Sequence, residues 1–243
     1  TLVNQNFTSS TDTFNTAVGF EAGNDITIGI NNTLIGGLAG DALTDADHNV
    51  AVGKSALSAD TLGNRSVALG AFALEVQNFT TATDVYNTAV GHGAGGVVTT
   101  GLHNTLIGGL AGVAFTDADS NTAVGKSALS ADTLGSKSVA IGSNCLATQN
   151  FTSATESFNT AVGYNAGLSV TTGQYNTLMG SGAGDAVTNG GTNVAVGTEA
   201  LTTETGGSEN TAVGHGASAQ QNGGSNNTSI GTLAGYQITT GDN

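Results

Sequence analysis

The sequence predicts an all-β fold, a repetitive parallel β-roll or β-solenoid with 17-residue coils, and three observations predict it. A five-residue unit, Asn/Ser–Thr/Val–Ala/Leu/Ser–aliphatic or Met–Gly, occurs 13 times at near-constant spacing. The chain contains 38 Gly and no Pro, and no 3.6-residue apolar stripe persists, which argues against helices. Residues that recur at one fixed period stack into ladders when each period is one turn of a solenoid.

The units follow one another at a 17-residue spacing except at two places. From Ser66 to Asn87 and from Ser138 to Asn159 the spacing is 21, a four-residue insertion. The insertion defines a longer, 72-residue period, with super-repeats at 5–76 and 77–148 and a drifting third at 149–243. We expect a partial insert-type repeat at 1–14 and a single roll of 13 coils over 15–243. The units begin at Asn15, Asn32, Asn49, Ser66, Asn87, Asn104, Asn121, Ser138, Asn159, Asn176, Asn193, Asn210 and Asn227.

The columns of the 17-residue unit assign a role to each part of the coil. Positions 2 and 4 are Thr/Val and aliphatic, an alternation typical of a short strand. Position 5 is Gly in all 13 copies, from Gly19 to Gly231, and predicts a tight bend with positive φ. Position 8 is Ala in every copy except Cys145, which indicates close packing between successive coils. We expect the polar residues of positions 10–17 to return the chain to the next coil.

The Asn column and the thin core bear on packing and assembly. Stacked Asn at position 1 is expected to form a side-chain amide ladder along the axis. Each coil has only two to four sizeable apolar side chains, and the strand face of positions 1, 3 and 5 is small and semi-apolar. The pattern leaves open which strand face lies inside. One chain would leave a face uncovered, so we expect lateral association, as a homotrimer, to bury it.

Composition excludes several classes of partner. Four Lys+Arg stand against 18 Asp+Glu, a formal net charge of −14, so the chain has no basic surface for nucleic acid or for an anionic membrane. No stretch approaches the ~18–20 apolar residues of a membrane span, so we expect no membrane insertion by this segment. One Cys excludes an intrachain disulfide framework and a multi-cysteine metal site. Because Cys145 falls in the Ala column, we expect a buried, inert thiol.

Two versions of the unit resemble repeats of known fibres. Ser66-Val67-Ala68-Leu69-Gly70 and Ser138-Val139-Ala140-Ile141-Gly142 resemble the head repeat of trimeric autotransporter adhesins, the YadA-like heads, although those heads repeat at a shorter period. Asn15-Thr16-Ala17-Val18-Gly19 and Asn32-Thr33-Leu34-Ile35-Gly36, each followed by an Ala-Gly pair, look like repeats in phage tail fibres. The resemblance covers residues 15–243 and implies a left-handed homotrimeric β-roll in a host-attachment device. It transfers no catalytic residue.

We therefore expect a structural and adhesive segment of a viral (phage) tail fibre, located in the virion, that presents loops to a host cell-surface receptor or glycan. The alternative is the head of a bacterial trimeric autotransporter adhesin at the cell surface, binding host cells or matrix. No nucleophile elbow or singled-out carboxylate pair supports an enzyme, and no cofactor is expected. A further alternative is an ice-binding solenoid with a flat Thr array at position 2, although Val interrupts that column and position 4 is aliphatic.

Acidic and imidazole side chains are the candidates for metal binding. Asp45 and Asp47, with their equivalents Asp117 and Asp119, place paired oxygens at i and i+2 on a polar loop and could join a calcium site. The alternative is a solvated acidic loop. Four His in no metal-binding spacing are expected to be exposed or interface side chains, or metal ligands on the axis of a trimer: His48, His92, His103 and His215.

Aromatic residues mark the recurrent Phe-Thr segment that precedes each full repeat. Only 5% of the residues are aromatic, so rings that recur at one place are distinctive. Phe7, Phe79 and Phe151 are candidates for contact with a receptor or sugar. The alternative is that they fill the core or the trimer interface where the coil is longer. Three further rings stand seven residues on: Phe14, Tyr86 and Phe158.

Overall fold

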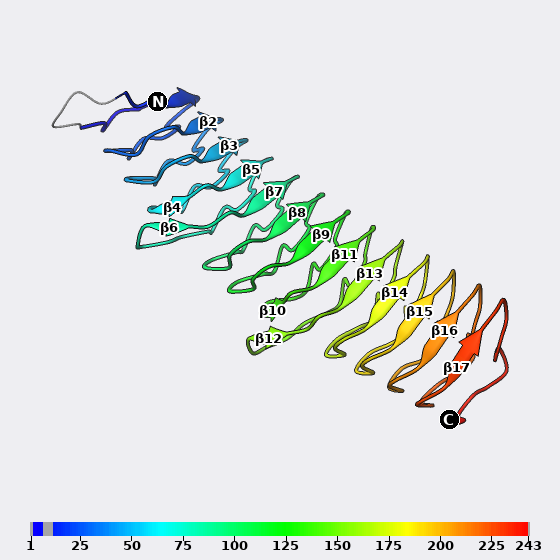
Figure 1. The fold of residues 1–243 in the computed structure, drawn as a ribbon. Coiled ribbons are helices and arrows are strands. Elements are labelled where there is room, and N and C mark those ends of the chain that lie inside the picture. The colour runs from blue at the N-terminus through cyan, green and yellow to red at the C-terminus, as the bar shows by residue number, and fades with distance from the viewer. Residues whose placement is uncertain (1, 7–11, 243) are drawn as a thin grey trace. The chain divides into compact units, whose positions relative to one another are not determined.

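The structure, a computed structural model, describes residues 2–6 and 12–242. These residues form no helix; they form short parallel strands stacked coil upon coil, with one main-sheet strand for each repeat (Figure 1). The parallel β-solenoid with 17-residue coils predicted from the repeat is therefore confirmed. The chain divides into two compact units, Thr1–Ser120 and Asn121–Asn243, each with its own stack of coils.

In the first unit, the strand of each coil pairs in parallel with the strand of the next. Partners are equivalent residues, so Thr16 pairs with Thr33 and Thr88 with Thr105. Across the insertion Val67 still pairs with Thr88, because the extra residues leave the coil as a loop. The described strands of this sheet are β1 (Thr16–Val18), β2 (Thr33–Ile35), β3 (Val50–Val52), β5 (Val67–Leu69), β7 (Thr88–Val90) and β8 (Thr105–Ile107). A small sheet beside the insertion joins β4 (Gly63–Asn64) to β6 (Thr83–Asp84).

The second unit repeats this arrangement. Val139 pairs with Thr160 across its insertion, and Thr177 pairs with Val194 farther on. Its described main strands are β9 (Thr122–Val124), β11 (Val139–Ile141), β13 (Thr160–Val162), β14 (Thr177–Met179), β15 (Val194–Val196), β16 (Thr211–Val213) and β17 (Thr228–Ile230). The small sheet at its insertion joins β10 (Gly135–Ser136) to β12 (Thr155–Glu156).

Glycine at position 5 ends each strand because the backbone there leaves no room for a side chain. Gly36 has a φ of +137°, and a Cβ on it would lie 2.6 Å from the carbonyl carbon of Gly53 in the next coil. The same close approach of successive backbones recurs along most of the column. The tight bend with positive φ predicted from the invariant Gly is confirmed.

Three further corners of each coil use left-handed backbone. Positions 7, 9 and the last position before the next Asn or Ser have φ near +50° to +65°, often without Gly. Asn adopts this region easily, whereas Arg65 (φ 63°), Tyr86 (φ 54°) and Phe158 (φ 49°) occupy it at a conformational cost. Hydrogen bonds between coils hold these corners; the Arg65 N–H, for example, donates to the Asp47 carbonyl at 3.0 Å.

Each strand turns its middle residue inward. The position 3 side chains, such as Leu34 and Ala51, are fully buried, as are the Ala of position 8 and most Asn of position 1. Positions 2 and 4 point outward, so that Ile35 is 39% exposed. The small, semi-apolar residues of positions 1 and 3 therefore form the core, and the face that a single chain leaves uncovered is the Thr/aliphatic face instead.

The Asn column bonds mainly to backbone groups. Asn49 Oδ1 accepts the backbone N–H of Ser66 at 2.8 Å, and Asn49 Nδ2 donates to the carbonyl of Gly63 at 2.9 Å. Each amide thus ties its own coil to the next, which satisfies a buried polar side chain. The sequence predicts an amide ladder; the stacked column is present, with an amide–amide contact of 3.3 Å from Asn227 to Asn210, but backbone groups are its main partners.

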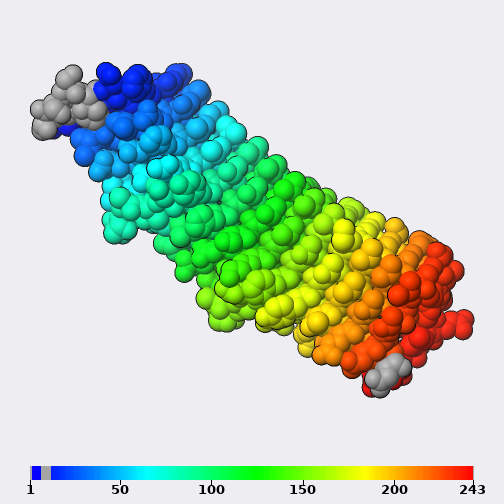
Figure 2. Space-filling model, viewed as in Figure 1, coloured from blue at the N-terminus to red at the C-terminus, as the bar shows by residue number. Residues whose placement is uncertain are grey.

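Positions 9 and 12 share one volume of the core. Where position 9 is Gly, position 12 is a large apolar residue, because a Cβ on Gly40 would lie 2.8 Å from Leu43 Cδ1. Where position 9 is Leu, as at Leu57, position 12 is Asp, Gln or Glu, as at Asp60, and is still buried. Figure 2 shows the outer surface of the coils, which pack against one another within each unit. Among the described residues there is no helix of the length and apolarity that crossing a bilayer requires.

Candidate functional site

The outer strand face is a two-column array without a charged residue. Position 2 supplies Thr or Val and position 4 supplies Val, Ile, Leu or Met. We call this surface the Thr/aliphatic array. It covers β1, β2, β3, β5, β7 and β8 in the first unit, and β9, β11 and β13 to β17 in the second. Its columns stay in register within each unit because strand pairing continues across the insertions.

The position 4 column leaves large aliphatic side chains at the surface. Ile107 is 39% exposed in the first unit, and Ile141 and Met179 are 40% and 43% exposed in the second. A contiguous row of exposed apolar side chains is characteristic of a surface that contacts a partner. Apart from Thr hydroxyls the array has no acid, base or nucleophile, so it can bind an apolar or flat surface and offers no groups for catalysis.

A cation and two rings stack at one corner of the first unit. The Arg65 guanidinium carbon lies 5.6 Å from the centroid of the Tyr86 ring. The Tyr86 and His103 rings stack at 5.9 Å, with 17° between their planes. Arg65 Nε also donates to Asp84 Oδ1 at 2.9 Å. Arg65, Tyr86 and His103 are the last residues of consecutive coils, so the solenoid itself brings them together.

The equivalent corner of the second unit repeats this cluster, each residue standing 72 positions after its counterpart. Lys137 Nζ lies 5.4 Å from the Phe158 ring centroid and pairs with the Glu156 carboxylate. Phe158 and Tyr175 stack at 5.5 Å, with 16° between their planes. We call the two clusters the ring ladders. Their rings are accessible, because Tyr86, Phe158 and Tyr175 are 50%, 42% and 56% exposed.

All four basic residues of the chain lie on the two equivalent coils that begin these ladders. Coil 49–65 carries Lys54 and Arg65, and coil 121–137 carries Lys126 and Lys137. Lys54 also lies over a ring, with its Nζ 5.3 Å from the centroid of Phe72. A cation over a ring at an exposed site stabilises by about 0.5–1 kcal/mol. This acidic chain therefore places most of its few cations beside aromatic residues.

The acidic pairs proposed for calcium contact the backbone of the preceding coil. Asp47 Oδ1 accepts the N–H of Ile30 at 2.8 Å, and the equivalent Asp119 accepts that of Leu102 at 2.7 Å. Their companions Asp45 and Asp117 are exposed. Among the described residues no three His, Cys, Asp or Glu side chains are grouped as a metal site would require. Among the described residues, the structure thus brings no third His, Cys, Asp or Glu side chain to these pairs.

Two of the three Phe candidates for receptor contact are buried. Phe79 is 7% exposed and Phe151 is 5% exposed, so both rings fill the core beside the insertion. Phe7 lies outside the described residues. The rings that reach the surface near the insertions are Tyr86 and Phe158, which the sequence marks only as neighbours of the Phe-Thr segment.

The remaining titratable candidates stand apart from one another. Cys145 is fully buried, and its Sγ donates to the Ala161 carbonyl at 3.2 Å. Burial raises the pKa of the Cys145 thiol to about 12, so little reactive thiolate forms at neutral pH. The four His occupy separate places: His48 beside Asn31, His92 edge-on to Phe72, His103 on Tyr86, and an exposed His215.

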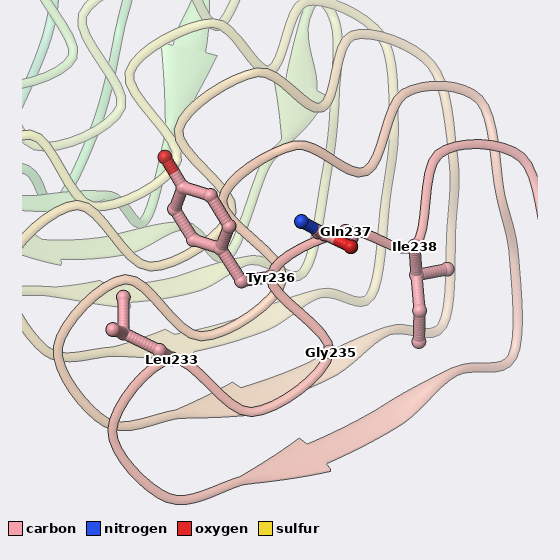
Figure 3. Close-up of a pocket in the computed structure, with 5 residues that line it drawn as sticks. All are labelled: Leu233, Gly235, Tyr236, Gln237 and Ile238. Carbon is pink, nitrogen blue, oxygen red and sulfur yellow. The ribbon is translucent and has the colours of Figure 1, made fainter.

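A hollow of about 590 Å³ lies on the last coil, lined by Leu233, Gly235, Tyr236, Gln237 and Ile238 (Figure 3). Ile238 is 37% exposed, whereas Val187, at the same position of an earlier coil, is fully buried. The hollow is therefore the open cross-section of the solenoid core. Tyr236 is the only titratable side chain among its five lining residues, so the hollow offers no acid–base pair for chemistry.

No family model, curated protein or solved structure matches the chain. The geometry alone identifies two candidate sites, the Thr/aliphatic array with its exposed aliphatic column and the ring ladders with their stacked, exposed rings.

Proposed function

We propose that this chain is a structural and adhesive segment of a homotrimeric fibre, a viral (phage) tail fibre that carries host-attachment surfaces on the virion. The observation that supports this proposal is the exposed aliphatic column of the Thr/aliphatic array. In a trimer, three arrays meet around one axis, and the position 4 aliphatic column of each chain becomes buried away from water. Each square ångström of apolar surface so buried contributes about 25 cal/mol.

Closed symmetry suits this surface. The array is one short strand wide and lacks charge, so a closed ring of chains hides every copy of it and leaves the other sides of each coil at the surface. The three-fold form is the one that the resemblance to tail-fibre and YadA-like repeats implies. The loops at the insertions then face outward from the fibre, where contact with a host surface requires them.

The test is the solution mass of the purified chain by light scattering. A trimer has three times the 23.7 kDa mass of one chain. We expect Ile107→Glu, which places a charge in the array, to reduce the mass toward that of one chain. Val97→Glu is the matched control, since Val97 is 44% exposed and lies outside the array.

Two results would contradict the proposal. The first is a stable 23.7 kDa monomer for the unmodified chain. The second is a mass that responds equally to the two substitutions, since the array would then have no special role in assembly. Circular dichroism of both variants checks that the solenoid itself is retained.

The head of a bacterial trimeric autotransporter adhesin is the alternative, and the Ser-Val-Ala-aliphatic-Gly units at Ser66 and Ser138 favour it. It uses the same trimer, so the mass does not separate the two. The flanking gene sequence does: a signal peptide and a membrane-barrel anchor mark an adhesin, whereas a chaperone domain or baseplate-binding segment marks a tail fibre.

Ice binding is a second candidate for the same surface, because the structure turns the Thr column outward and holds it in register. Thr88 and Thr105, for example, are direct partners on neighbouring strands. A trimer would cover this column, so the two functions exclude each other. Thermal hysteresis from a monomeric chain, lost in Thr105→Tyr, would establish ice binding and remove the fibre proposal.

A further inference from the structure

Fibre assembly does not account for the ring ladders. Their residues lie at the coil corner that leads into each strand, and not at positions 2 and 4, which form the Thr/aliphatic array. Each ladder combines a cation, its carboxylate partner and two stacked rings on three consecutive coils. The same combination stands at Arg65, Asp84 and Tyr86 and, one 72-residue period later, at Lys137, Glu156 and Phe158.

The backbone favours a different residue at these corners. Asn31 and Asn226 occupy the same coil position with φ of 61° and 62°, in the region that Asn adopts most easily among side-chain-bearing residues. Tyr86 and Phe158 adopt φ of 54° and 49° there, although an aromatic residue disfavours this conformation. The same left-handed φ recurs at this corner in other coils, as at Thr192 and Glu209, so exposed aromatic rings and not backbone strain distinguish Tyr86 and Phe158.

The chemistry of the ladders fits one class of ligand. Half-exposed rings offer apolar surface, and the ion pair beside them offers both donors and acceptors. The net charge of −14 disfavours polyanions, and the one cation of each ladder is already paired with a carboxylate. A wholly apolar ligand would leave the ion pair unused. A sugar ring carries an apolar C–H face and a rim of hydroxyl groups, and so matches both parts.

We propose that the ring ladders bind a neutral glycan. The cation and the second ring cover the faces of Tyr86 and Phe158, so a pyranose lies along the exposed edges of the stacked rings. Its hydroxyls bond to the ion pair, Arg65 with Asp84 in one ladder and Lys137 with Glu156 in the other. The proposal rests on the adhesive function proposed above and names its ligand class and contact surface. The insertion loop adjoins each ladder, since Asp84 and Glu156 belong to β6 and β12.

The test uses an array of immobilised neutral oligosaccharides of hexopyranoses, with sialylated and sulfated oligosaccharides beside them. The full chain is compared with the double variant Tyr86→Asn/Phe158→Asn, whose new side chains suit the left-handed corner. We expect binding to at least one neutral oligosaccharide and a loss of at least tenfold in the double variant. Tyr164→Asn is the control, since Tyr164 is 58% exposed and lies outside both ladders.

Three outcomes would overturn the proposal: no binding of the full chain to neutral oligosaccharides, binding to acidic oligosaccharides alone, or equal loss in the Tyr164 control. Solution mass is measured on the same samples. A trimer that binds no glycan refutes the ladder proposal and leaves the fibre proposal standing. A monomer that binds neutral glycans through the ladders refutes the fibre proposal alone. Circular dichroism and melting temperature confirm that the double variant is folded, as the Asn residues of equivalent corners lead us to expect.

Discussion

Asp60 and Gln77 form a fully buried hydrogen bond of 2.6 Å between two consecutive coils. Gln77 Nε2 donates to Asp60 Oδ2, while Asp60 Oδ1 accepts the N–H groups of Gly63 and Phe79, each at 3.0 Å. Gln77 Oε1 in turn accepts from Asn87 Nδ2 at 2.9 Å. The pair therefore connects three coils around the insertion through polar groups that lie wholly inside the solenoid.

The pair recurs at the 72-residue period. Gln149 donates to Asp132 at 2.6 Å, and Gln221 donates to Glu204 at 3.2 Å. Glu204 lies in the segment where the sequence pattern has drifted and no insertion follows. Its Oε1 still accepts the N–H of Gly223 at 2.8 Å, as Asp60 accepts that of Phe79. The super-repeat thus persists in the core after it has faded at the surface.

Exchanging the two side chains should separate the energy of the Asp60–Gln77 hydrogen bond from that of the other contacts of these residues. Asp60→Asn sets one amide against another, and Gln77→Glu sets two carboxyl groups together, so each single variant leaves buried groups unpaired. We expect each to lower the free energy of unfolding by about 1–3 kcal/mol. The double variant Asp60→Asn/Gln77→Glu restores a donor opposite an acceptor and should recover at least half of the summed loss. Urea denaturation of all four proteins measures this coupling, and strictly additive losses would contradict it.

Protonation of Asp60 should make the free energy of unfolding depend on pH. Burial raises the pKa of Asp60 above its ordinary value of 3.8, and outweighs hydrogen bonds from Phe79, Gln77 and Gly63 that lower it. The folded state therefore holds the proton more tightly than the unfolded chain. Its contribution to stability is fully present below pH 3.8 and is lost as the pH rises through the folded-state pKa.

Asp60→Asn removes this titration and serves as the reference. The free energy of unfolding of the unmodified chain, minus that of Asp60→Asn, should fall as the pH rises above 3.8. Urea denaturation at a series of pH values measures the difference. A difference that rises over this range would show that the hydrogen bonds outweigh burial.

The repeat alone predicts the coil, the strand and the bend, since each follows from one column with one physical requirement. Gly at position 5 tolerates no substitute because successive backbones nearly touch. Position 8 admits only a small side chain, Ala or the single Cys145, because it is fully buried in most coils. The inward face was not predictable from the same columns. Positions 2 and 4 are the more hydrophobic pair, and burial of Asn49 becomes favourable only because its amide bonds to Gly63 and Ser66 in two coils.

Two further columns of the sequence correspond to contacts that the fold reveals. Position 13 is Thr in most coils, and its hydroxyl donates to the carbonyl one coil on, as Thr44 does to Thr61 at 3.1 Å. The alternation of Leu with Gly at position 9 accompanies the choice of a polar or apolar residue at position 12.

For the ring ladders, the 72-residue period identifies Tyr86 and Phe79 equally well. Only the fold shows that Phe79 is inside and Tyr86 outside, because the period says nothing about which corner each occupies.

Adjacent glycines offer a matched test of the coil geometry. A Cβ on Gly36 would lie 2.6 Å from the carbonyl carbon of Gly53, and an Ala at this position would have to adopt a φ of +137°. A Cβ on Gly37, in contrast, would have no atom within 4 Å. We expect Gly36→Ala to lower the free energy of unfolding by about 3 kcal/mol or more. Gly37→Ala should change it by no more than about 1 kcal/mol in either direction. Equal effects in urea denaturation would mean that the coils do not approach as described.

Reactions and substitutions of Cys145 test whether position 8 is inaccessible to solvent and too tightly packed for a larger side chain. The thiol should resist iodoacetamide at pH 8 in the folded chain and react in urea, since burial raises its pKa from 9.0 to about 12. Cys145→Ala should cost about 1 kcal/mol or less, because Ala is the residue of the other coils. Cys145→Leu should cost about 1–3 kcal/mol by forcing neighbouring coils apart.

The raised pKa of Cys145 also predicts how the free energy of unfolding changes with pH. Because the folded-state pKa is the higher one, the contribution of the thiol is present below pH 9.0 and is lost as the pH rises toward about 12. The free energy of unfolding of the unmodified chain should therefore fall relative to that of Cys145→Ala as the pH rises above 9.0. Alkylation counted by mass spectrometry and urea denaturation from pH 8 to 11 make the two measurements. Rapid alkylation of the folded chain would place Cys145 at the surface and contradict the packing of the whole Ala column.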